Sequence, residues 1–326
     1  MSIMGAFRRA VMAPSLTEVS FAGRGFAVTS TEETRRLEGV PQAVVCGFEW
    51  AIGDRSLADT ERRLSMVDAD VRGFAYEGAT MACAVRDAMG PRRGHRTRDL
   101  LQGDGGRPHI FLNYIGIGFA MARLPRPLWR GILPPLTGAE YYPAMNWLAV
   151  DGYGFDRAYF DTARWAGRQR RPRPYAWQGD ADYFLRAVDQ GIGRALWFIH
   201  GTHVDHVTGA VSAFAERRQA DLWSGVGLAA TFAGGAPALM TALRRKAGPH
   251  GGHLAQGAVF AAKARHHCGH VPEHTRAAVH ALTGLEVRAA AELADDCAVP
   301  AAESGTVPAY EIWRRRVRER VSAVSV

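Results

Sequence analysis

The sequence predicts an all-α protein built from helical repeats. Six glycines recur at intervals of 38, 36, 39, 34 and 32 residues, each within or at the head of an apolar stretch. This interval is the length of one helical hairpin with its turns. Period-two alternation, which is typical of β-strands, is nearly absent. We therefore expect six hairpins, stacked either as a tetratricopeptide-like superhelix or as a closed α/α toroid. The repeating glycines are Gly78, Gly116, Gly152, Gly191, Gly225 and Gly257.

Four parts follow one another along the chain. We expect an irregular N-terminal segment over 1–30, a single helical-repeat domain over 31–297, a linker over 298–308 and a basic C-terminal helix over 309–326. The linker is expected from its small residues and two prolines.

The elements of the repeat domain follow from apolar periodicity and from turn residues. The first helices of the six pairs are rich in glycine and alanine, which lets neighbouring helices approach closely. They are expected at 75–89, 110–123, 142–166, 180–199, 220–232 and 253–266. Partner helices are expected at 97–101, 128–133, 204–214, 237–246 and 274–282, with 31–52 and 57–67 before the repeats and 287–296 as a cap.

Composition favours a folded, cytoplasmic protein. With 47% hydrophobic residues and eight tryptophans, the 326-residue chain can bury a large core. Its four cysteines are far apart and show no paired spacing, which is typical of a reduced compartment. Residues 222–243 carry no charge and are long enough to cross a bilayer. The turn expected at Gly234-Gly235-Ala236-Pro237 divides this stretch, so we expect no stable membrane span.

The net charge of +8 favours acidic partners. Most arginines are scattered, as on an ordinary solvated surface, but two clusters occur at 168–173 and 313–320. Either cluster can be a solvated surface or a docking face for an acidic protein. Nucleic acid is not an expected partner, because no recognition motif accompanies the charge.

Polar residues directly precede five of the six glycines. A polar residue at a helix start is often a cap for free N–H groups. If the helices are equivalent, however, these side chains should converge, and convergent buried polar groups mark a pocket. The expected cluster is Glu77, Asp151, Gln190, Ser224 and Gln256, with Asp189, Arg194 and Lys263 nearby in sequence.

Asp151 is the first choice as catalytic acid and Glu77 the second. Asp151 heads the most aromatic repeat, where burial would keep a proton on its carboxyl group. Aromatic residues of the middle repeats either pack the core or line a cavity for an unsaturated ligand. Of these, Tyr153, Trp197 and Trp223 are the candidate ligand contacts, with Gln190, Ser224 and Gln256 orienting the ligand.

No cofactor motif is present. The chain lacks a phosphate-binding Gly-Lys loop, a nucleophile elbow and a dinucleotide fingerprint after a strand. His266, Cys268, His270 and His274 are zinc-type ligands within one turn, but their spacing matches no structural zinc pattern, and a polar helix-to-helix turn explains them equally. We therefore expect neither cofactor nor metal.

Five motifs occur in order along most of the chain. They are RGFAYEGA at 72–79, DGYGF at 151–155, DQGIGR at 189–194, DLWSGVGLA at 221–229, and LAQG at 254–257 with FAAKAR at 260–265. In these motifs the chain resembles the UnbL-type proteins of bacterial enediyne biosynthesis clusters, a family grouped as domain of unknown function 1702. The resemblance implies a place beside an enediyne polyketide synthase, but it supplies no reaction.

Two hypotheses follow. In the first, the protein is a cofactor-independent enzyme that isomerises or cyclises a long unsaturated, polyene or enediyne-type intermediate in a helical-repeat cavity. In the second, it is a non-catalytic scaffold or carrier that sequesters this intermediate or docks an acyl carrier protein or the polyketide synthase. A buried carboxylate in a pocket favours the enzyme.

Overall fold

Helices make up the secondary structure of the described chain, apart from one isolated bridge between Trp177 and Asp180, so the all-α prediction is confirmed. The computed structural model describes residues 14–54, 56–90, 95–139, 141–300 and 305–324. Residues 1–13 of the expected N-terminal segment, 301–304 of the expected linker and 325–326 of the expected C-terminal helix lie outside the described residues.

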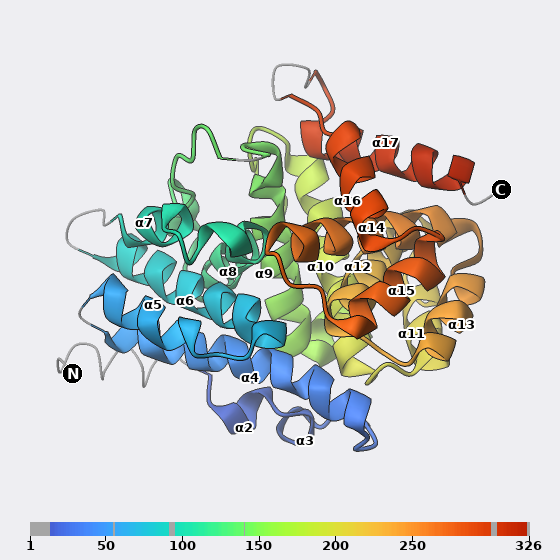
Figure 1. Ribbon diagram of the computed structural model, residues 1–326, viewed down its shortest axis with the longest axis horizontal. Helices are drawn as coiled ribbons and strands as arrows, with labels where there is room; N and C mark the ends of the chain where they lie inside the picture. The colour runs from blue at the N-terminus through green and yellow to red at the C-terminus, as the bar shows by residue number, and fades with distance from the viewer. Residues whose placement is uncertain (1–13, 55, 91–94, 140, 301–304, 325–326) are drawn as a thin grey trace.

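The helices fall into an inner layer and its covering elements (Figure 1). The inner layer consists of α4 (Glu32–Gly53), α6 (Ala69–Met89), α8 (Ile110–Arg123), α9 (Trp147–Phe160), α10 (Ala181–Ile199), α12 (Glu216–Ala233) and α14 (Gly251–His267). The covering helices are α5 (Leu57–Ser65), α7 (Arg96–Gln102), α11 (Val204–Ser212), α13 (Pro237–Ala247), α15 (Glu273–Thr283), α16 (Val287–Asp296) and α17 (Ala309–Val324). Two one-turn helices, α2 (Leu16–Val19) and α3 (Phe21–Arg24), precede α4.

Each inner helix packs chiefly on the next one along the chain. Neighbours run in the same direction: Trp147 and Tyr183, near the starts of α9 and α10, have ring centroids 4.7 Å apart. Towards the C-terminal ends of these helices, the ring centroids of Phe155 and Phe198 lie 5.4 Å apart. The connections must therefore return the chain across the outside of the layer.

Glycine brings the inner helices into backbone contact. A Cβ atom built at Gly191 would lie 1.9 Å from the Asp151 carbonyl oxygen on α9, and one at Gly193 would lie 2.0 Å from that of Leu222 on α12. Residues i and i+2 point about 200° apart around a helix, so a Gly-x-Gly pair serves opposite neighbours. The same pairing occurs in α8, α9 and α12, where Gly116, Gly152 and Gly225 face the preceding helix.

Four of the five expected partner helices are present. Helices α7, α11, α13 and α15 lie near the expected positions, but the helix expected at 128–133 is replaced by a 3-10 turn over Arg126–Trp129, and α9 is followed by a π turn. Prolines explain this, because Pro125, Pro127, Pro134 and Pro135 occupy the first connection and Pro172 and Pro174 the second. The expected helix over 142–166 also ends early, at Phe160, and continues as a π turn over Ala163–Gly167.

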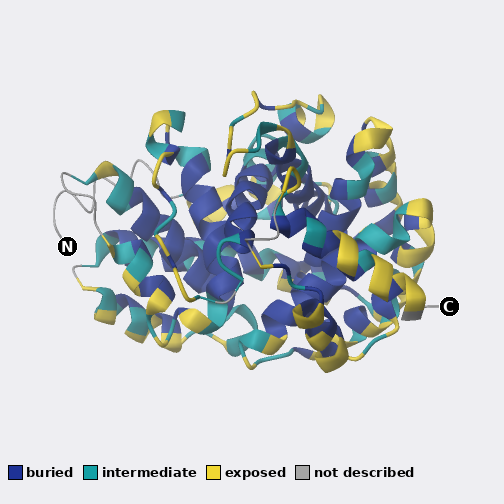
Figure 2. Ribbon diagram, turned by 90° about the horizontal axis from the view of Figure 1, so that it is seen from above, coloured by how far each residue is buried: buried dark blue, intermediate teal, exposed yellow. Residues whose placement is uncertain are grey.

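The inner layer curls back on itself. The ring of Phe74 on α6 contacts that of Phe232 on α12, with centroids 5.4 Å apart. Arg265 on α14 donates to the Asp70 carbonyl oxygen at the start of α6, over 3.0 Å. Figure 2 shows the buried residues gathered in the interior and the exposed ones on the outer helices and turns.

The turn expected within residues 222–243 is present, since α12 ends at Ala233 and α13 begins at Pro237. None of the helices in the described ranges combines the length and the apolar character that crossing a membrane requires.

Helix α17 packs on the repeat layer. Trp313 is buried and donates to the Ala294 carbonyl oxygen of α16, and Arg314 is fully buried. Arg315, Arg316 and Arg320 are exposed, so only part of this basic helix faces solvent.

We predict that Gly225→Ala destabilises the protein by at least about 3 kcal/mol. The new Cβ would lie 1.9 Å from the Gln190 carbonyl oxygen, and two backbones must separate to admit it. Gly209→Ala on α11 is the matched control, because nothing lies within 4 Å of its Cβ position. This control should gain about 0.5–1 kcal/mol from helix propensity. Urea unfolding followed by circular dichroism measures the stability of both variants. If Gly225→Ala and the wild type unfold at the same urea concentration, the close helix contact does not require glycine at position 225.

Candidate functional site

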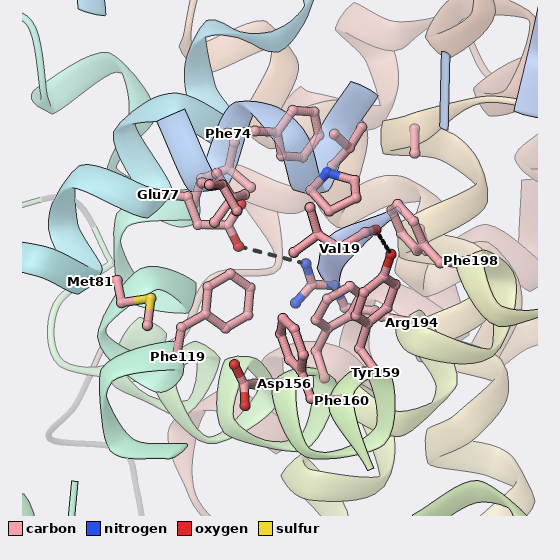
Figure 3. Close-up of a pocket in the computed structure, with 18 of the residues that line it drawn as sticks. Val19, Phe74, Glu77, Met81, Phe119, Asp156, Tyr159, Phe160, Arg194 and Phe198 are labelled. Atoms are coloured by element: carbon pink, nitrogen blue, oxygen red, sulfur yellow. Dashed lines mark hydrogen bonds and ion pairs between the residues drawn. The ribbon is translucent and has the colours of Figure 1, made fainter. Parts of the chain in front are cut away.

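The inside of the curled layer holds an apolar cavity (Figure 3). Helices α4, α6, α8, α9, α10 and α12 all contribute to its wall. The cavity volume that the centre of a water molecule can occupy is about 50 Å³. Six phenylalanines give the wall its aromatic character: Phe74, Phe119, Phe155, Phe160, Phe198 and Phe232. Such a wall suits an apolar, unsaturated ligand.

The N-terminal segment covers one side of this cavity. Pro14 and Val19 belong to the wall, and the Tyr159 hydroxyl donates to the Val19 carbonyl oxygen over 2.6 Å. The backbone N–H of Phe21 donates to Glu38 of α4 over 2.6 Å. Arg24 donates to the Phe160 carbonyl oxygen at the end of α9, also over 2.6 Å. The segment is thus fixed to α4 and α9 by a small number of polar contacts.

Two carboxyl groups line the cavity: Asp156 is paired with Arg123 at 2.9 Å, whereas Glu77 has no such close partner. Its side chain is 1% exposed, and neither oxygen has a hydrogen-bond partner among the described residues. Burial raises the pKa of Glu77 to about 8; the charge of Asp151 adds to the shift, while Arg194 opposes it from 4.0 Å. Near neutral pH Glu77 therefore retains a proton that it can donate.

Asp151, the first choice of acid from the sequence, lies behind this wall and does not line the cavity. Arg194 forms an ion pair with its Oδ1, and the Gln190 amide donates to its Oδ2 over 2.7 Å. A carboxylate held in this way anchors Arg194 and has no open path to a ligand. Of the two carboxyl groups predicted from the sequence, Glu77 therefore reaches the cavity, and Asp151 holds Arg194 in place.

All five polar residues that precede the glycines lie in one buried network. Gln190 and Gln256 are joined through Ser224, whose hydroxyl lies 3.4 Å and 3.0 Å from their side-chain oxygens. With Asp151 and Arg194, the network extends from Gln256 on α14 to Glu77 on α6. The sequence expectation of convergence thus agrees with the observed positions.

The far end of the network is completed by α17, which the sequence did not connect with the site. Arg314 donates to Gln256 over 3.0 Å and to Asp221 and Glu311 over 2.9 Å each. The Tyr310 hydroxyl accepts a hydrogen bond from Gln190 over 3.1 Å. The arginine cluster at 313–320 does not indicate from the sequence alone that Arg314 is buried.

Other candidates lie elsewhere. Asp189 pairs with Arg218, as close as 2.6 Å, and Lys263 pairs with Asp295 at 2.8 Å. The Trp197 indole donates to the Gly234 carbonyl oxygen at the end of α12. The remaining two aromatic candidates, Tyr153 and Trp223, are buried but do not line the cavity.

The side chains of the histidine-rich turn each contact a different part of the protein. His270 contacts Asp70 at 2.6 Å, His274 contacts the Phe232 carbonyl oxygen, and the Cys268 thiol donates to the Arg265 carbonyl oxygen. In the part of the chain that the structure describes, no group of three or more His, Cys, Asp or Glu side chains is arranged to hold a metal ion.

Comparison with known families matches residues 3–321 to a single family, described as protein of unknown function DUF1702. The chain belongs to this family. No curated protein and no solved structure matches it significantly. Family membership thus covers the inner layer, the cavity and most of α17, and it names no activity.

We predict that Glu77→Gln flattens the pH dependence of stability. Between pH 4.5 and about 8 the unfolded chain releases the Glu77 proton while the folded protein retains it, so the folded state loses stability as pH rises through this window. Glutamine carries no such proton. From pH 5 to pH 9 the variant should therefore lose less stability than wild type, by roughly 3–5 kcal/mol.

Urea midpoints at the two pH values measure this difference. Glu273→Gln is the matched control, because the Glu273 side chain is 89% exposed. Parallel pH profiles for wild type and Glu77→Gln would show that burial does not shift the titration of Glu77.

Proposed function

We propose that the protein binds an apolar, unsaturated small molecule in the cavity and isomerises or cyclises it by general acid–base chemistry. Glu77 is the proton donor, and Arg194, held by Asp151, orients the reacting group. The observation that carries this proposal is a buried carboxyl group, without a hydrogen-bond partner among the described residues, on an aromatic wall. Its burial raises the pKa of Glu77, which favours the protonated form. A general acid of this kind contributes about 10²–10⁴ to a rate.

Aromatic faces support the same chemistry. The Arg194 guanidinium lies 5.0 Å from the centroid of Phe155, so this wall already accommodates one cation. A positive charge that develops on an unsaturated ligand after proton transfer would meet similar faces. The reaction requires no redox cofactor, in agreement with the absence of nucleotide and flavin motifs from the sequence.

A closed ring of helices would provide the enclosed site that this chemistry requires. We infer a closed α/α ring rather than an open superhelix, because α6 contacts both α12 and α14 through Phe74–Phe232 and Arg265–Asp70. A ring encloses its ligand from several sides. The cavity of about 50 Å³ is narrow, so a long ligand requires the N-terminal segment to move outward.

The resemblance to UnbL-type proteins supports a polyketide-derived polyene of an enediyne pathway as the ligand, in the bacterial cytoplasm. Deletion of the gene in a producing host, followed by mass analysis, should reveal an accumulated unsaturated intermediate.

Complementation of that deletion tests the acid. Glu77→Gln should lower product at least about a hundredfold, because glutamine cannot transfer a proton, while Glu273→Gln should restore wild-type yield. Asp151→Asn should also lower product, because Arg194 loses its charged support. Folded variants at both sites that restore full yield would contradict catalysis by these carboxyl groups.

A second candidate is the non-catalytic scaffold or carrier that docks an acyl carrier protein. The observation that favours it is the exposed outer face of α17, with Arg315, Arg316 and Arg320.

For this candidate, we expect affinity for an acidic carrier protein to fall steeply as salt rises past about 0.15 M, where screening acts within roughly 8 Å. Arg315→Gln should weaken binding without unfolding the protein, as calorimetric titration can measure. Removal of 309–326 is unsuitable, because it also removes the buried Arg314. Binding that is insensitive to salt would exclude this surface.

A further inference from the structure

Three buried polar atoms of the pair Glu77 and Arg194 have no hydrogen-bond partner among the described residues. They are both carboxyl oxygens of Glu77 and the Nε of Arg194. The two side chains are 1% and 6% exposed and lie on opposite sides of the wall, from α6 and α10 (Figure 3). Buried polar groups usually have partners, and leaving one unsatisfied costs about 1–3 kcal/mol. The other charged pair on this wall, Arg123 and Asp156, is already matched. The unsatisfied atoms of Glu77 and Arg194 therefore indicate a polar ligand atom between them.

The charges around this point are balanced. Arg194 is paired with Asp151, and Arg123 is paired with Asp156 at 2.9 Å on the α8–α9 side of the wall. The parts of the wall from α4 and α12 are apolar. Among the described residues, the charges that act on Glu77 are those of Arg194 and Asp151, and Glu77 is neutral when protonated. A ligand with a full charge would be left unpaired here, so the site fits a neutral molecule.

Both groups offer hydrogen atoms to the same region. Protonated Glu77 has one O–H, and Arg194 has an N–H at Nε. A carbonyl oxygen has two lone pairs and can accept both, whereas a hydrocarbon can accept neither. The aromatic rings on the rest of the wall fit a planar, unsaturated body.

We propose that the ligand is a neutral, conjugated carbonyl compound whose oxygen lies between Glu77 and Arg194. This inference rests on the proposed function and narrows its substrate class from unsaturated molecules to those with a carbonyl group in conjugation with the double bonds. The carbonyl gives Glu77 a defined atom to protonate, and Arg194 fixes the end of the molecule at which this happens.

The resulting chemical step balances without a co-reactant. The O–H bond of Glu77 breaks as an O–H bond forms on the carbonyl oxygen, and the C=O bond becomes C–OH. The positive charge spreads along the conjugated carbons, so a C=C bond gains single-bond character and the chain can rotate about it. Return of the proton to Glu77 restores the carbonyl, and the net change is isomerisation of one double bond.

Two probes of equal chain length test the proposal: 2,4,6-octatrienal, and the hydrocarbon 2,4,6-octatriene, which lacks the oxygen. We expect the aldehyde to bind at least tenfold more tightly to the wild-type protein. Its absorption band should also move to longer wavelength, because hydrogen bonds to the carbonyl oxygen polarise the conjugated chain. Absorption difference titrations measure both quantities.

Glu77→Leu removes the O–H, so only the Arg194 Nε–H can still donate to the carbonyl oxygen. The wavelength shift and the preference for the aldehyde should both shrink while triene binding persists; Glu273→Gln should change neither. A second measurement needs no variant. As pH rises through about 8, Glu77 loses its proton, so the wavelength shift of the aldehyde should shrink in the same way while the triene continues to bind.

The outcomes separate this inference from the proposed function. Equal affinities for aldehyde and triene, or a shift of undiminished size in a folded Glu77→Leu variant and at high pH, overturn the carbonyl inference and leave an apolar binding cavity. Failure of both probes to bind overturns the inference and the proposed function together.

Discussion

Close backbone contact between neighbouring inner helices is the constraint on which this structure depends. A side chain larger than hydrogen at Gly152, Gly191, Gly225 or Gly257 would meet a carbonyl group of the preceding helix at 1.9–2.2 Å. The contact fixes both the spacing and the rotation of each helix. The residue before each glycine therefore points in an equivalent direction in every repeat. The buried polar network is a consequence of helix packing, because glycine contacts bring Asp151, Gln190, Ser224 and Gln256 into line.

Unequal pairing of charges gives this network two different ends. At one end, three arginines surround Glu311; burial alone would raise its pKa, but Arg314, Arg186 and Arg318 lower it to about 2. At the other end, Arg194 is engaged by Asp151, and Glu77 is left with burial as the dominant influence. Glutamate is thus held in its charged form on α17, at Glu311, and favoured in its neutral form at the cavity, at Glu77. The number of nearby arginines and their distances determine the difference in pKa between Glu311 and Glu77.

Local regularity made part of this arrangement predictable. The glycine interval identifies the inner helices, and the position before each glycine identifies the network, because both repeat along the chain. Asp189 and Gln190 show the limit: they are adjacent, yet about 100° apart on α10, so one faces Arg218 and the other the network. Arg314 and the cavity were not predictable in this way. Both depend on contacts between residues far apart in sequence, and so does the ranking of Glu77 above Asp151.

The position of Arg314 has a consequence for the order of folding. Its partners Asp221 and Gln256 precede Arg314 by 93 and 58 residues, so both leave the ribosome before α17 is complete. Until α17 arrives, Gln256 lacks its arginine and Asp221 is paired with Arg186 alone, so the buried polar groups at this end are only partly matched. The layer can assemble from its N-terminal side during translation. The packing of α12 and α14 at this end of the network is therefore complete only once α17 has been synthesised.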